Sequence, residues 1–515
     1  MSDDVILHLV VVGFHHKKGS QIEYVFPPFE KEEPTKLPQE WSNLPSLALP
    51  DGAHNIVSDV VYFLLPSRDD PAKVVYGISC YRQIESAHLV AKTDDVTRNT
   101  VLKSVCVIST VPLFGCLKLK ISLLTEAYFN ERDFSQIDVL AQMYQNLLDV
   151  YEREHIAGDA AVMDISTREL VQRFRHSIIV LFKLLLLEKR VIFSAFPVQL
   201  LGDTMLALAS LCPRVVEEGL LYSGTPPHQE PEPEKVQEEE EEPKIEVGVE
   251  ASTSQPELTD PLADVKDGFG FPLSIFTTGN LFHPYASINF LDTIRSTAIR
   301  GYTIGVTNQV FLQRKGIADV VITIDDKNFP NIDIRDPELR RVLKLTNLDA
   351  RFGDYLLKSV EQNYLEESAW QGSDEWVRLQ FKNYLISLAF AARSGNLEKH
   401  TDFFPPFVAA WMETNNYRIL AQCTPELSAG EEGHVGATLP PREIGMMIGN
   451  AIKSNPKLNS FVSWFKAAAT SAASQMSAAG EMPNSNSNFY LEEAQEAKEI
   501  VEKPAATTSE PEQKP

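Results

Sequence analysis

The stretch from Thr225 to Asp267 constrains the fold more than any other feature, because it cannot form part of a packed core. It is rich in proline, glutamate and serine and has almost no aromatic residues. Fourteen acidic and three basic residues lie between Glu230 and Asp267, a net charge of -11. A segment of this composition cannot bury enough apolar surface to offset the entropy of ordering the chain. We therefore expect a disordered insert at 225–267, used as a solvated tether or regulatory segment, with folded units on either side of it.

Charge and cysteine usage narrow the class of protein. The 515-residue chain carries a formal net charge of -24 at pH 7, which argues against nucleic-acid binding because nucleic acids select basic surfaces. Its five cysteines include no Cys-x-x-Cys pair, and three lie in apolar runs, as expected of reduced thiols in the cytosol. Asp3 and Asp4 stand where a signal peptide would have a basic region, so we expect none.

The most apolar stretch, SIIVLFKLLLL at Ser177–Leu187, is predicted to be a buried helix. It is interrupted by Lys183 and closed by the charged run Glu188-Lys189-Arg190. A bilayer span needs about 20 apolar residues, which this stretch does not reach. We therefore expect no transmembrane segment.

Near the N-terminus, the stretch VVVGFHHKKGS (Val10–Ser20) resembles a strand that leads into a phosphate-binding loop. In such a loop the lysine follows the second glycine, whereas Lys18 precedes Gly19 here. The next residues alternate with the period of a strand, so we predict a β-hairpin of Val5–Phe14 and Gln21–Phe26.

Two adjacent histidines near this turn, His15 and His16, raise the question of a metal site. Neighbouring residues on a strand point to opposite faces, which makes the two rings poor ligands for one ion. No third ligand sits nearby in the sequence. We expect turn histidines and no metal site.

The remainder of residues 1–152 is predicted to be a small α/β unit, an antiparallel sheet backed by helices. Strands are expected at Asp59–Leu65, Lys73–Arg82 and Ser104–Thr110. A helix capped by Asp133 or Ser135 should follow. Its buried stripe is expected to be Ile137, Leu140, Tyr144, Leu147 and Tyr151.

A second α/β unit is expected at 165–330, interrupted by the acidic insert. The predicted order is helix Arg168–Leu187, strand Arg190–Phe196 and helix Gln199–Leu211, followed after the insert by strands Pro272–Thr277, Gly301–Thr307 and Asp319–Ile324. Alternating helices and strands are typical of an α/β sheet covered by helices.

A third unit, at 335–422, is predicted to be helical. One helix there should begin at the N-cap Ser373, carry Asp374 and Glu375 in its positive first turn and end at Gly395. Its buried stripe is expected to be Trp376, Phe381, Tyr384, Leu385 and Leu388.

The tail at 423–515 contains one helical pattern near 460–480. Its bulky apolar residues include Phe461, Trp464, Phe465 and Met476, and Lys466 is the only charge. Such a helix either enters lipid-packing defects as a peripheral membrane contact or docks onto the helical unit. Both interpretations remain open from the sequence.

Motifs of catalysis are absent from the sequence. It contains no nucleophile elbow, no His-Glu-x-x-His, no kinase signatures and no dinucleotide fingerprint. We therefore expect no catalytic residue of the hydrolase, transferase or oxidoreductase kind, no cofactor and no metal. A long chain without catalytic motifs is typical of a protein that binds another macromolecule.

The order of segments resembles the DENN-domain proteins, and within them the subfamily of the late secretory pathway. The similar stretches are VVVGFHHKKG, LPSLALPDGAHN, GISCYRQIE, TRNTVLKSVCVIS, AYFNERDFSQI, FRHSIIVLFKLLLLEKRVIF, DPELR and GSDEWVRLQF. They extend from Val10 to Phe381. The resemblance implies an α/β protein of three DENN modules: a longin-like α/β module, a central α/β module and a helical downstream module.

The resemblance also implies a function. DENN proteins act as guanine-nucleotide exchange factors for Rab GTPases, and this subfamily is linked to late exocytic or recycling traffic and to cell polarity or migration. An exchange factor stabilises the nucleotide-free GTPase and needs no nucleophile or metal of its own. We expect a cytoplasmic protein that binds peripherally to late Golgi, secretory vesicle or recycling endosome membranes.

Two alternatives to exchange stay open. One is a trafficking scaffold without exchange activity. The other is GTPase activation, because the folliculin-like branch of the superfamily supplies an arginine finger from its longin module. If the protein activates a GTPase, Arg98 is the candidate residue nearest to the GTPase, although Val101 and Leu102 differ from the residues expected at an arginine finger.

Overall fold

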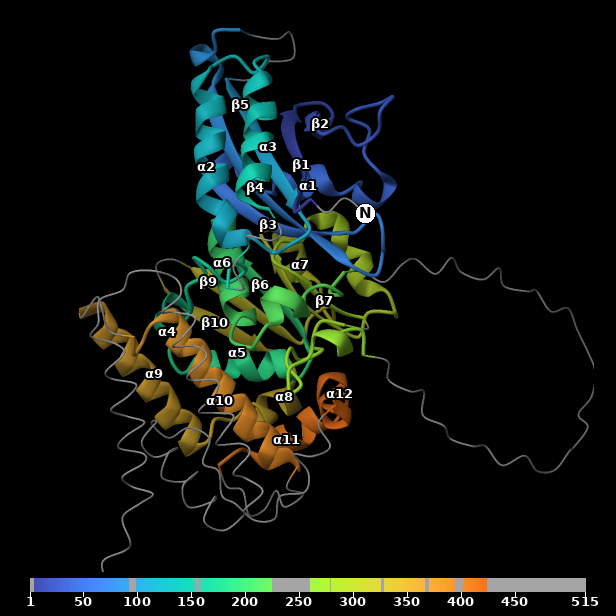
Figure 1. The fold of residues 1–515 in the computed structure, drawn as a ribbon. Helices are drawn as coiled ribbons and strands as arrows, with labels where there is room; N and C mark the ends of the chain where they lie inside the picture. Colours follow the sequence, from blue (N-terminus) through green and yellow to red (C-terminus); the bar gives the residue numbers. More distant parts are fainter. Residues whose placement is uncertain are drawn as a thin grey trace, which may run out of the picture.

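The computed structural model describes residues 4–91, 99–152, 156, 159–224, 260–277, 279–325, 328–365, 370–393 and 402–423. Figure 1 shows two sheets stacked one above the other, with a layer of helices beneath the lower sheet. The mixed α/β fold class is confirmed.

The first sheet is built from the N-terminal strands. Its strands are β1 (Ile6–His15), β2 (Gly19–Phe26), β3 (Ser58–Pro66), β4 (Val74–Glu85) and β5 (Thr100–Ser109). They pair in the order β2-β1-β5-β4-β3, and every neighbouring pair is antiparallel. The predicted hairpin and the three further strands are therefore confirmed.

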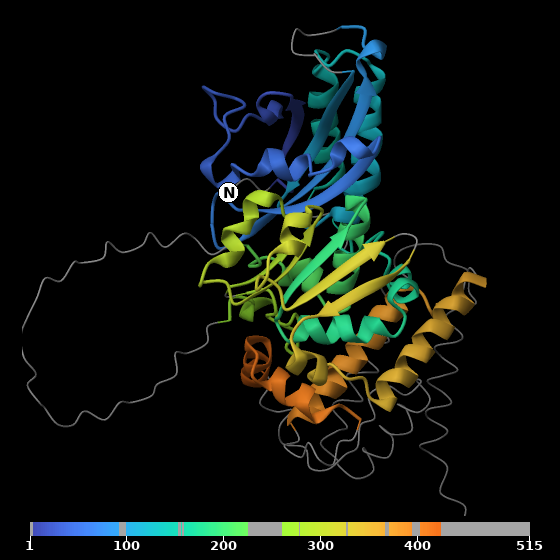
Figure 2. The same cartoon turned by 180° about the vertical axis from the view of Figure 1, so that it is seen from behind.

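Helices cover both faces of this sheet. The long helices α2 (Phe114–Asn130) and α3 (Asp138–Val150) lie side by side on one face (Figure 1). The short helix α1 (Leu44–Ala48) lies on the opposite face, as the reverse view shows (Figure 2). Both faces of the sheet are therefore part of a core, and β3 and β5 are correspondingly buried along most of their length.

The second sheet is largely parallel. It consists of β6 (Arg190–Ala195), β7 (Asn280–His283), β8 (Gly301–Val306), β9 (Val320–Asp325) and β10 (Asn328–Ile334), paired in the order β10-β9-β6-β8-β7. Only β10, at one edge, is antiparallel to its neighbour. Helices α4 (Thr167–Phe174), α5 (Ser177–Leu186), α6 (Val198–Ala209) and α7 (Gln309–Gln313) accompany it. Continuous burial of β7 and β8 is typical of parallel strands covered on both faces.

The third layer is helical, as predicted. It contains α8 (Pro337–Val342), α9 (Asn347–Leu365), α10 (Asp374–Arg393), α11 (Pro405–Met412) and α12 (Asn415–Cys423). The Ser373 hydroxyl caps α10, accepting from the Trp376 backbone N–H at 3.2 Å. All five residues of the expected stripe are buried. The expected end at Gly395 lies outside the described residues.

Shorter turns complete the described chain. 3₁₀ turns lie at Gln39–Trp41, Ala53–Asn55, Ser86–His88, Ala263–Val265, Ile288–Leu291 and Thr293–Arg295, and a π-helical turn lies at Val215–Gly219.

Several local predictions were wrong. The single helix expected at Arg168–Leu187 is two helices, separated where Arg175 adopts a positive φ of 50°. Pro272–Thr277 is not a strand but a buried irregular segment. Helix α3 begins after Ile137 without a side-chain cap, and Ile137 is 41% exposed, so neither the predicted cap nor this member of the stripe is correct. The other four members of the stripe are buried.

The acidic insert is shorter than expected at its C-terminal end. Residues 225–259 lie outside the described residues, but 260–267 are packed on the body. Leu262 is buried, and the Asp260 carboxylate accepts from the Ser274 hydroxyl at 2.6 Å. The Lys266 ammonium donates to the Pro272 carbonyl at 2.8 Å and pairs with Asp260 at 3.3 Å. Charge alone misled the sequence prediction here, because these charges are paired with each other.

Candidate functional site

The turn LPDGAHN, residues 49–55, joins the first sheet to the second. The Asp51 backbone N–H donates to the Tyr285 hydroxyl oxygen at 3.0 Å, and the Asp51 carbonyl accepts from the Thr307 hydroxyl at 3.0 Å. The Asp51 carboxylate accepts from the Asn308 amide at 2.8 Å. Gly52 has a φ of +90°, which favours glycine, and a Cβ there would lie 3.4 Å from the Phe196 ring. The turn is thus held by three side chains of the central unit.

A buried carboxylate from the first sheet caps a helix of the second. Asp59, in β3, accepts from the backbone N–H groups of Val198 at 2.7 Å and Gln199 at 3.2 Å, the first residues of α6. The Tyr81 hydroxyl donates to the same carboxylate at 3.3 Å. Burial raises the pKa of Asp59, and these hydrogen bonds oppose the rise. Because every partner is a donor, the site is built for the ionised carboxylate, which also suits the positive end of α6.

A second polar chain crosses the same junction. The Tyr62 hydroxyl, from β3, donates to the Asp203 carboxylate of α6 at 2.8 Å. The Lys118 ammonium, from α2, lies 3.8 Å from Asp203 and 2.8 Å from Asp164. Burial lowers the pKa of Lys118, but Asp203 and Asp164 outweigh it, so the net shift is upward. Lys118 therefore stays charged, and its ion pairs hold helix α2 against the central unit.

Exposed apolar side chains surround this junction. Val57 is 62% exposed, Phe196 38% and Val310 38%. Val57 precedes β3 by one residue, and Phe196 lies against Gly52. Val310 lies two residues after Asn308, the partner of Asp51, and its backbone N–H donates to the Asn308 side chain. We call Val57, Phe196 and Val310, with the turn 49–55 between them, the seam rim. A rigid surface with exposed apolar residues and satisfied polar groups is suited to docking a macromolecule.

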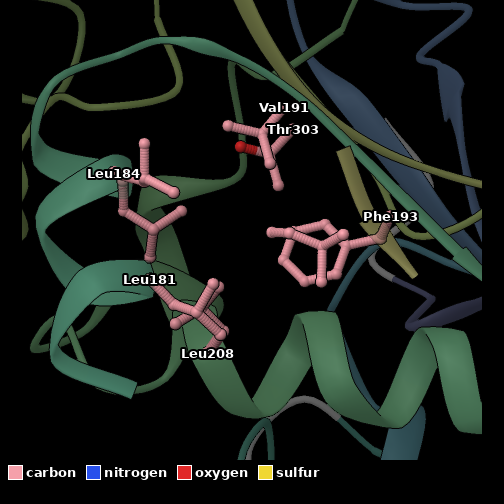
Figure 3. Close-up of a pocket in the computed structure, with 8 residues that line it drawn as sticks. Leu181, Leu184, Val191, Phe193, Leu208 and Thr303 are labelled. Carbon is pink, nitrogen blue, oxygen red and sulfur yellow. The ribbon is translucent and has the colours of Figure 1, made fainter. Parts of the chain in front are cut away.

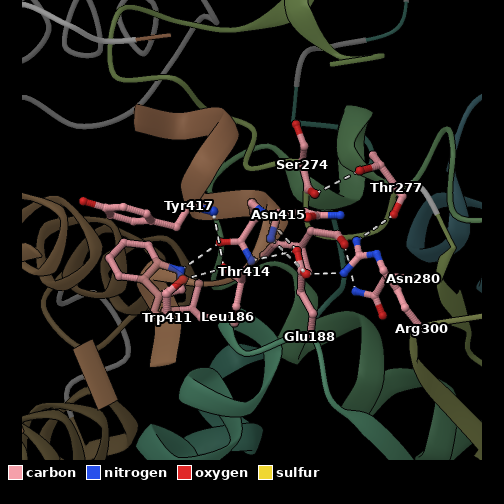
Figure 4. Close-up of polar contacts among 12 residues, drawn as sticks. Leu186, Glu188, Ser274, Thr277, Asn280, Arg300, Trp411, Thr414, Asn415 and Tyr417 are labelled. Atoms are coloured by element: carbon pink, nitrogen blue, oxygen red, sulfur yellow. Dashed lines mark hydrogen bonds and ion pairs between the residues drawn. The ribbon is translucent and has the colours of Figure 1, made fainter. Parts of the chain in front are cut away.

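The central unit is joined to the helical layer through Glu188 (Figure 4). The Glu188 carboxylate is paired with the Arg300 guanidinium. It also accepts from the backbone N–H groups of Asn416 at 3.0 Å and Asn415 at 3.3 Å, so it caps α12. The Asn416 side chain in turn accepts from the Trp411 indole N–H at 2.8 Å. One carboxylate therefore holds the last two described helices against the central sheet.

A buried ion pair makes the same connection deeper in the core. The Lys183 ammonium of α5 lies 2.6 Å from the Asp349 carboxylate of α9, and both side chains are fully buried. The Tyr384 hydroxyl donates to Asp349 at 2.8 Å. Burial lowers the pKa of Lys183, and the adjacent Asp349 carboxylate opposes that shift. Lys183, which interrupts the apolar run in the sequence, is thus a structural residue.

An apolar void among the described residues could be mistaken for a ligand site. It lies between α5, α6 and the central sheet, where Leu181, Leu184, Phe193 and Leu208 point toward one another (Figure 3). It is too small to admit a water molecule. It is therefore a feature of core packing.

The residues singled out from the sequence have mixed outcomes. Arg98 and the tail residues Phe461, Trp464, Phe465 and Met476 lie outside the described residues. His15 and His16 do not point to opposite faces, because His16 already belongs to the turn and the two rings stack with centroids 4.8 Å apart. Within the described part of the chain, no three His, Cys, Asp or Glu side chains are grouped to hold a metal ion. No helix among the residues searched is long and apolar enough to span a bilayer.

Sequence reasoning located only part of the junction. It placed strands on both sides of the contact, at Asp59–Leu65 and Arg190–Phe196. It missed the roles of Asp51, Asp59 and Phe196 because their partners are more than a hundred residues away, and only the position of Asp59, a charged residue at the start of an apolar strand, hinted at its role.

Comparison with known proteins matches most of the described chain. The family model of the transport protein Avl9 matches residues 6–392. A Schizosaccharomyces pombe protein named late secretory pathway protein avl9 is 31% identical over 436 residues, which cover 80% of this chain and 86% of that protein. A Saccharomyces cerevisiae protein named late secretory pathway protein AVL9 is 30% identical over 465 residues, covering 81% of this chain and 58% of that longer protein. The chain belongs to the Avl9 family of transport proteins.

Proposed function

We propose that this protein regulates late secretory or recycling traffic by binding a small GTPase of the Rab class and promoting its guanine-nucleotide exchange. Membership in a family of transport proteins, with yeast relatives named for the late secretory pathway, supports a role in secretory traffic. The Rab partner and the exchange activity rest on the resemblance to DENN proteins, which the order of the three structural layers supports. A role in cell polarity or migration would follow from such traffic.

The observation that carries the proposal is the seam rim. Hydrogen bonds of Asp51 and Asp59 join the two α/β units. Val57, Phe196 and Val310 remain exposed around this junction. A docked GTPase would meet a surface that does not have to rearrange, so little binding energy would be lost to ordering it.

Such a surface can promote exchange without catalytic residues. An exchange factor binds the nucleotide-free GTPase more tightly than the loaded form, and by thermodynamic linkage it weakens nucleotide binding by the same factor. The described residues need supply only apolar contacts and positioned polar groups. No cofactor is required for this role.

We place the protein in the cytoplasm, in peripheral contact with late Golgi, secretory vesicle or recycling endosome membranes. The predicted helix near 460–480 with Phe461, Trp464, Phe465 and Met476 is the proposed membrane contact. Flotation of the full chain with small and large liposomes, wild type beside Trp464→Ala, tests this. Equal and negligible recovery in every case would remove the membrane role of this helix.

Release of fluorescent GDP from a panel of purified Rab proteins, with GTP hydrolysis followed in parallel, tests the exchange proposal. We expect release from one or a few Rabs to accelerate at least about tenfold, within the usual range of coupling between two ligands. Binding without faster release would identify a scaffold. Faster hydrolysis would favour GTPase activation, for which Arg98 is the candidate.

A further inference from the structure

Helix α2 is apolar on both of its faces. Leu117, Ile121 and Tyr128 are buried against the first sheet. On the opposite side, Leu119 is 67% exposed and Leu123 is 57% exposed. These two leucines are four residues apart, so they lie one above the other on the helix, and exposed Ala127 continues the row. We call Leu119, Leu123 and Ala127 the outer α2 stripe.

The outer α2 stripe is not explained by the fold. Figures 1 and 2 show α2 at the outer edge of the upper layer, with α3 beside it and no described element over its outer side. Single exposed apolar residues are normal on any protein, but an aligned pair of leucines on one regular helix is a feature of interfaces. The exposed Met163, at 51%, extends the apolar surface because its sulfur lies 3.7 Å from the Cys116 sulfur at the start of α2.

The charges along α2 indicate what covers the stripe. Lys120 lies in its first half, whereas Glu126 lies in its second half and Glu131 directly follows it. Lys118, also in the first half, is already paired with Asp164 and Asp203. Two copies of this helix packed antiparallel would place the basic end of each against the acidic end of the other and would oppose their helix dipoles favourably. A parallel pair would bring like charges together. The helix is therefore complementary to itself in one orientation.

These charged residues also have contacts within the chain. The Lys120 ammonium lies 4.2 Å from the centre of the Tyr151 ring, and Glu126 lies 3.6 Å from the Arg82 guanidinium. Glu126 nevertheless remains half exposed. It keeps oxygen lone pairs that can accept from a second copy.

We propose that the outer α2 stripe is a homodimer interface, in which α2 of one copy packs antiparallel against α2 of a second copy across a two-fold axis near Leu123. Isologous two-fold dimers are the commonest oligomers, and one residue on the axis meeting its own equivalent is their signature. The apolar surface is small, so the dimer is weak, with a dissociation constant in roughly the micromolar range.

Sedimentation of the full chain between roughly 1 and 100 μM tests the interface, because this range spans the expected dissociation constant. The wild type should pass from monomer to dimer with rising concentration. The double variant Leu119→Glu, Leu123→Glu should stay monomeric with an unchanged melting temperature, since both side chains are exposed. Phe329→Glu is the matched control, because Phe329 is 77% exposed on β10 of the second sheet, and it should dimerise like the wild type.

A charge exchange tests the antiparallel orientation. Lys120→Glu and Glu126→Lys should each weaken the dimer severalfold, and the two together should restore it. A wild type that stays monomeric throughout, a leucine double variant that dimerises normally, or a combined charge variant no better than either single one would overturn the proposal. A monomeric wild type that floats with lipid vesicles only when Leu119 and Leu123 are present would assign the stripe to a membrane instead.

Discussion

At the scale of single residues, Asp59 makes the most specific contribution to the junction. Replacing Asp59 with alanine removes the cap of α6 and leaves the buried N–H groups of Val198 and Gln199 without their acceptor. We expect a loss of about 2–4 kcal/mol in the free energy of unfolding, measured by urea denaturation. Asp59→Asn keeps one acceptor oxygen and should lose less. An alanine variant as stable as the wild type would show that the cap does not hold the junction.

His283 predicts a dependence of stability on pH. Its side chain is buried in β7, and its Nε2 atom has no hydrogen-bond partner in the described part of the chain. Burial lowers the pKa of His283 to about 4 from the usual 6.5. Between about pH 6.5 and pH 4, the His283 side chain is therefore protonated in the unfolded chain but neutral in the folded chain. The folded state has its full stability above about pH 6.5. It loses stability as the pH falls toward 4. The loss amounts to about 3 kcal/mol.

Denaturation of wild type and His283→Leu at pH 7 and pH 4.5 isolates this effect from that of other titrating groups. Leucine has a similar volume and needs no hydrogen-bond partner, so the two proteins should differ little at pH 7. The variant should lose less stability on acidification. Equal losses in both proteins would show that His283 does not titrate as described.

At the scale of elements, the acidic insert now divides into two parts. Deleting 225–259 should leave the melting temperature nearly unchanged, because the composition of this segment offers little apolar surface. Deleting 225–267 also removes buried Leu262 and the Lys266–Asp260 pair, and it should lower the melting temperature by roughly 5 °C or more. The two deletions compared by thermal unfolding check this. Identical melting temperatures would mean that 260–267 contribute nothing.

The elements also show which features the sequence could predict. Strands with alternating or continuous apolar residues, such as β1 and β8, were predicted because their pattern is local. Helix α2 was missed because its outer leucines blur the one-sided pattern of a surface helix. The break at Arg175 carries no glycine or proline signal, and Pro272–Thr277 resembles a strand because a buried loop needs the same apolar residues.

The contacts of the candidate site could not be predicted from the sequence, because the partners of its residues are distant in the chain. A carboxylate next to a turn normally faces water, and nothing within a few residues of Asp51 or Asp59 reveals a partner in the central unit. From the sequence, Lys183 was interpreted only as an interruption of the apolar run, and Glu188 only as its end. Their roles arise from partners on α9 and α12, which the chain reaches after more than 150 residues.

At the scale of the whole molecule, buried charges join the layers. Glu188 is paired with Arg300 of its own unit and caps α12 of the helical layer, whereas Asp59 and Lys183 each have their charge satisfied by a different layer. A fragment lacking that layer would keep a buried charge without its partner, which costs several kcal/mol. The function should therefore be tested with substitutions in the full chain, and not with separated units.

The most direct test of the central claim is the binding of nucleotide-free Rab proteins to the full chain and to Phe196→Asp. Phe329→Asp is the matched control, because Phe329 is a phenylalanine exposed by 77% on β10, outside the seam rim. If a Rab docks on the seam rim, Phe196→Asp should weaken its binding by roughly 30-fold or more, as expected for an aromatic anchor, and Phe329→Asp should bind like the wild type. Retention of no Rab by the wild type, or equal affinity of the wild type and Phe196→Asp, would contradict the account.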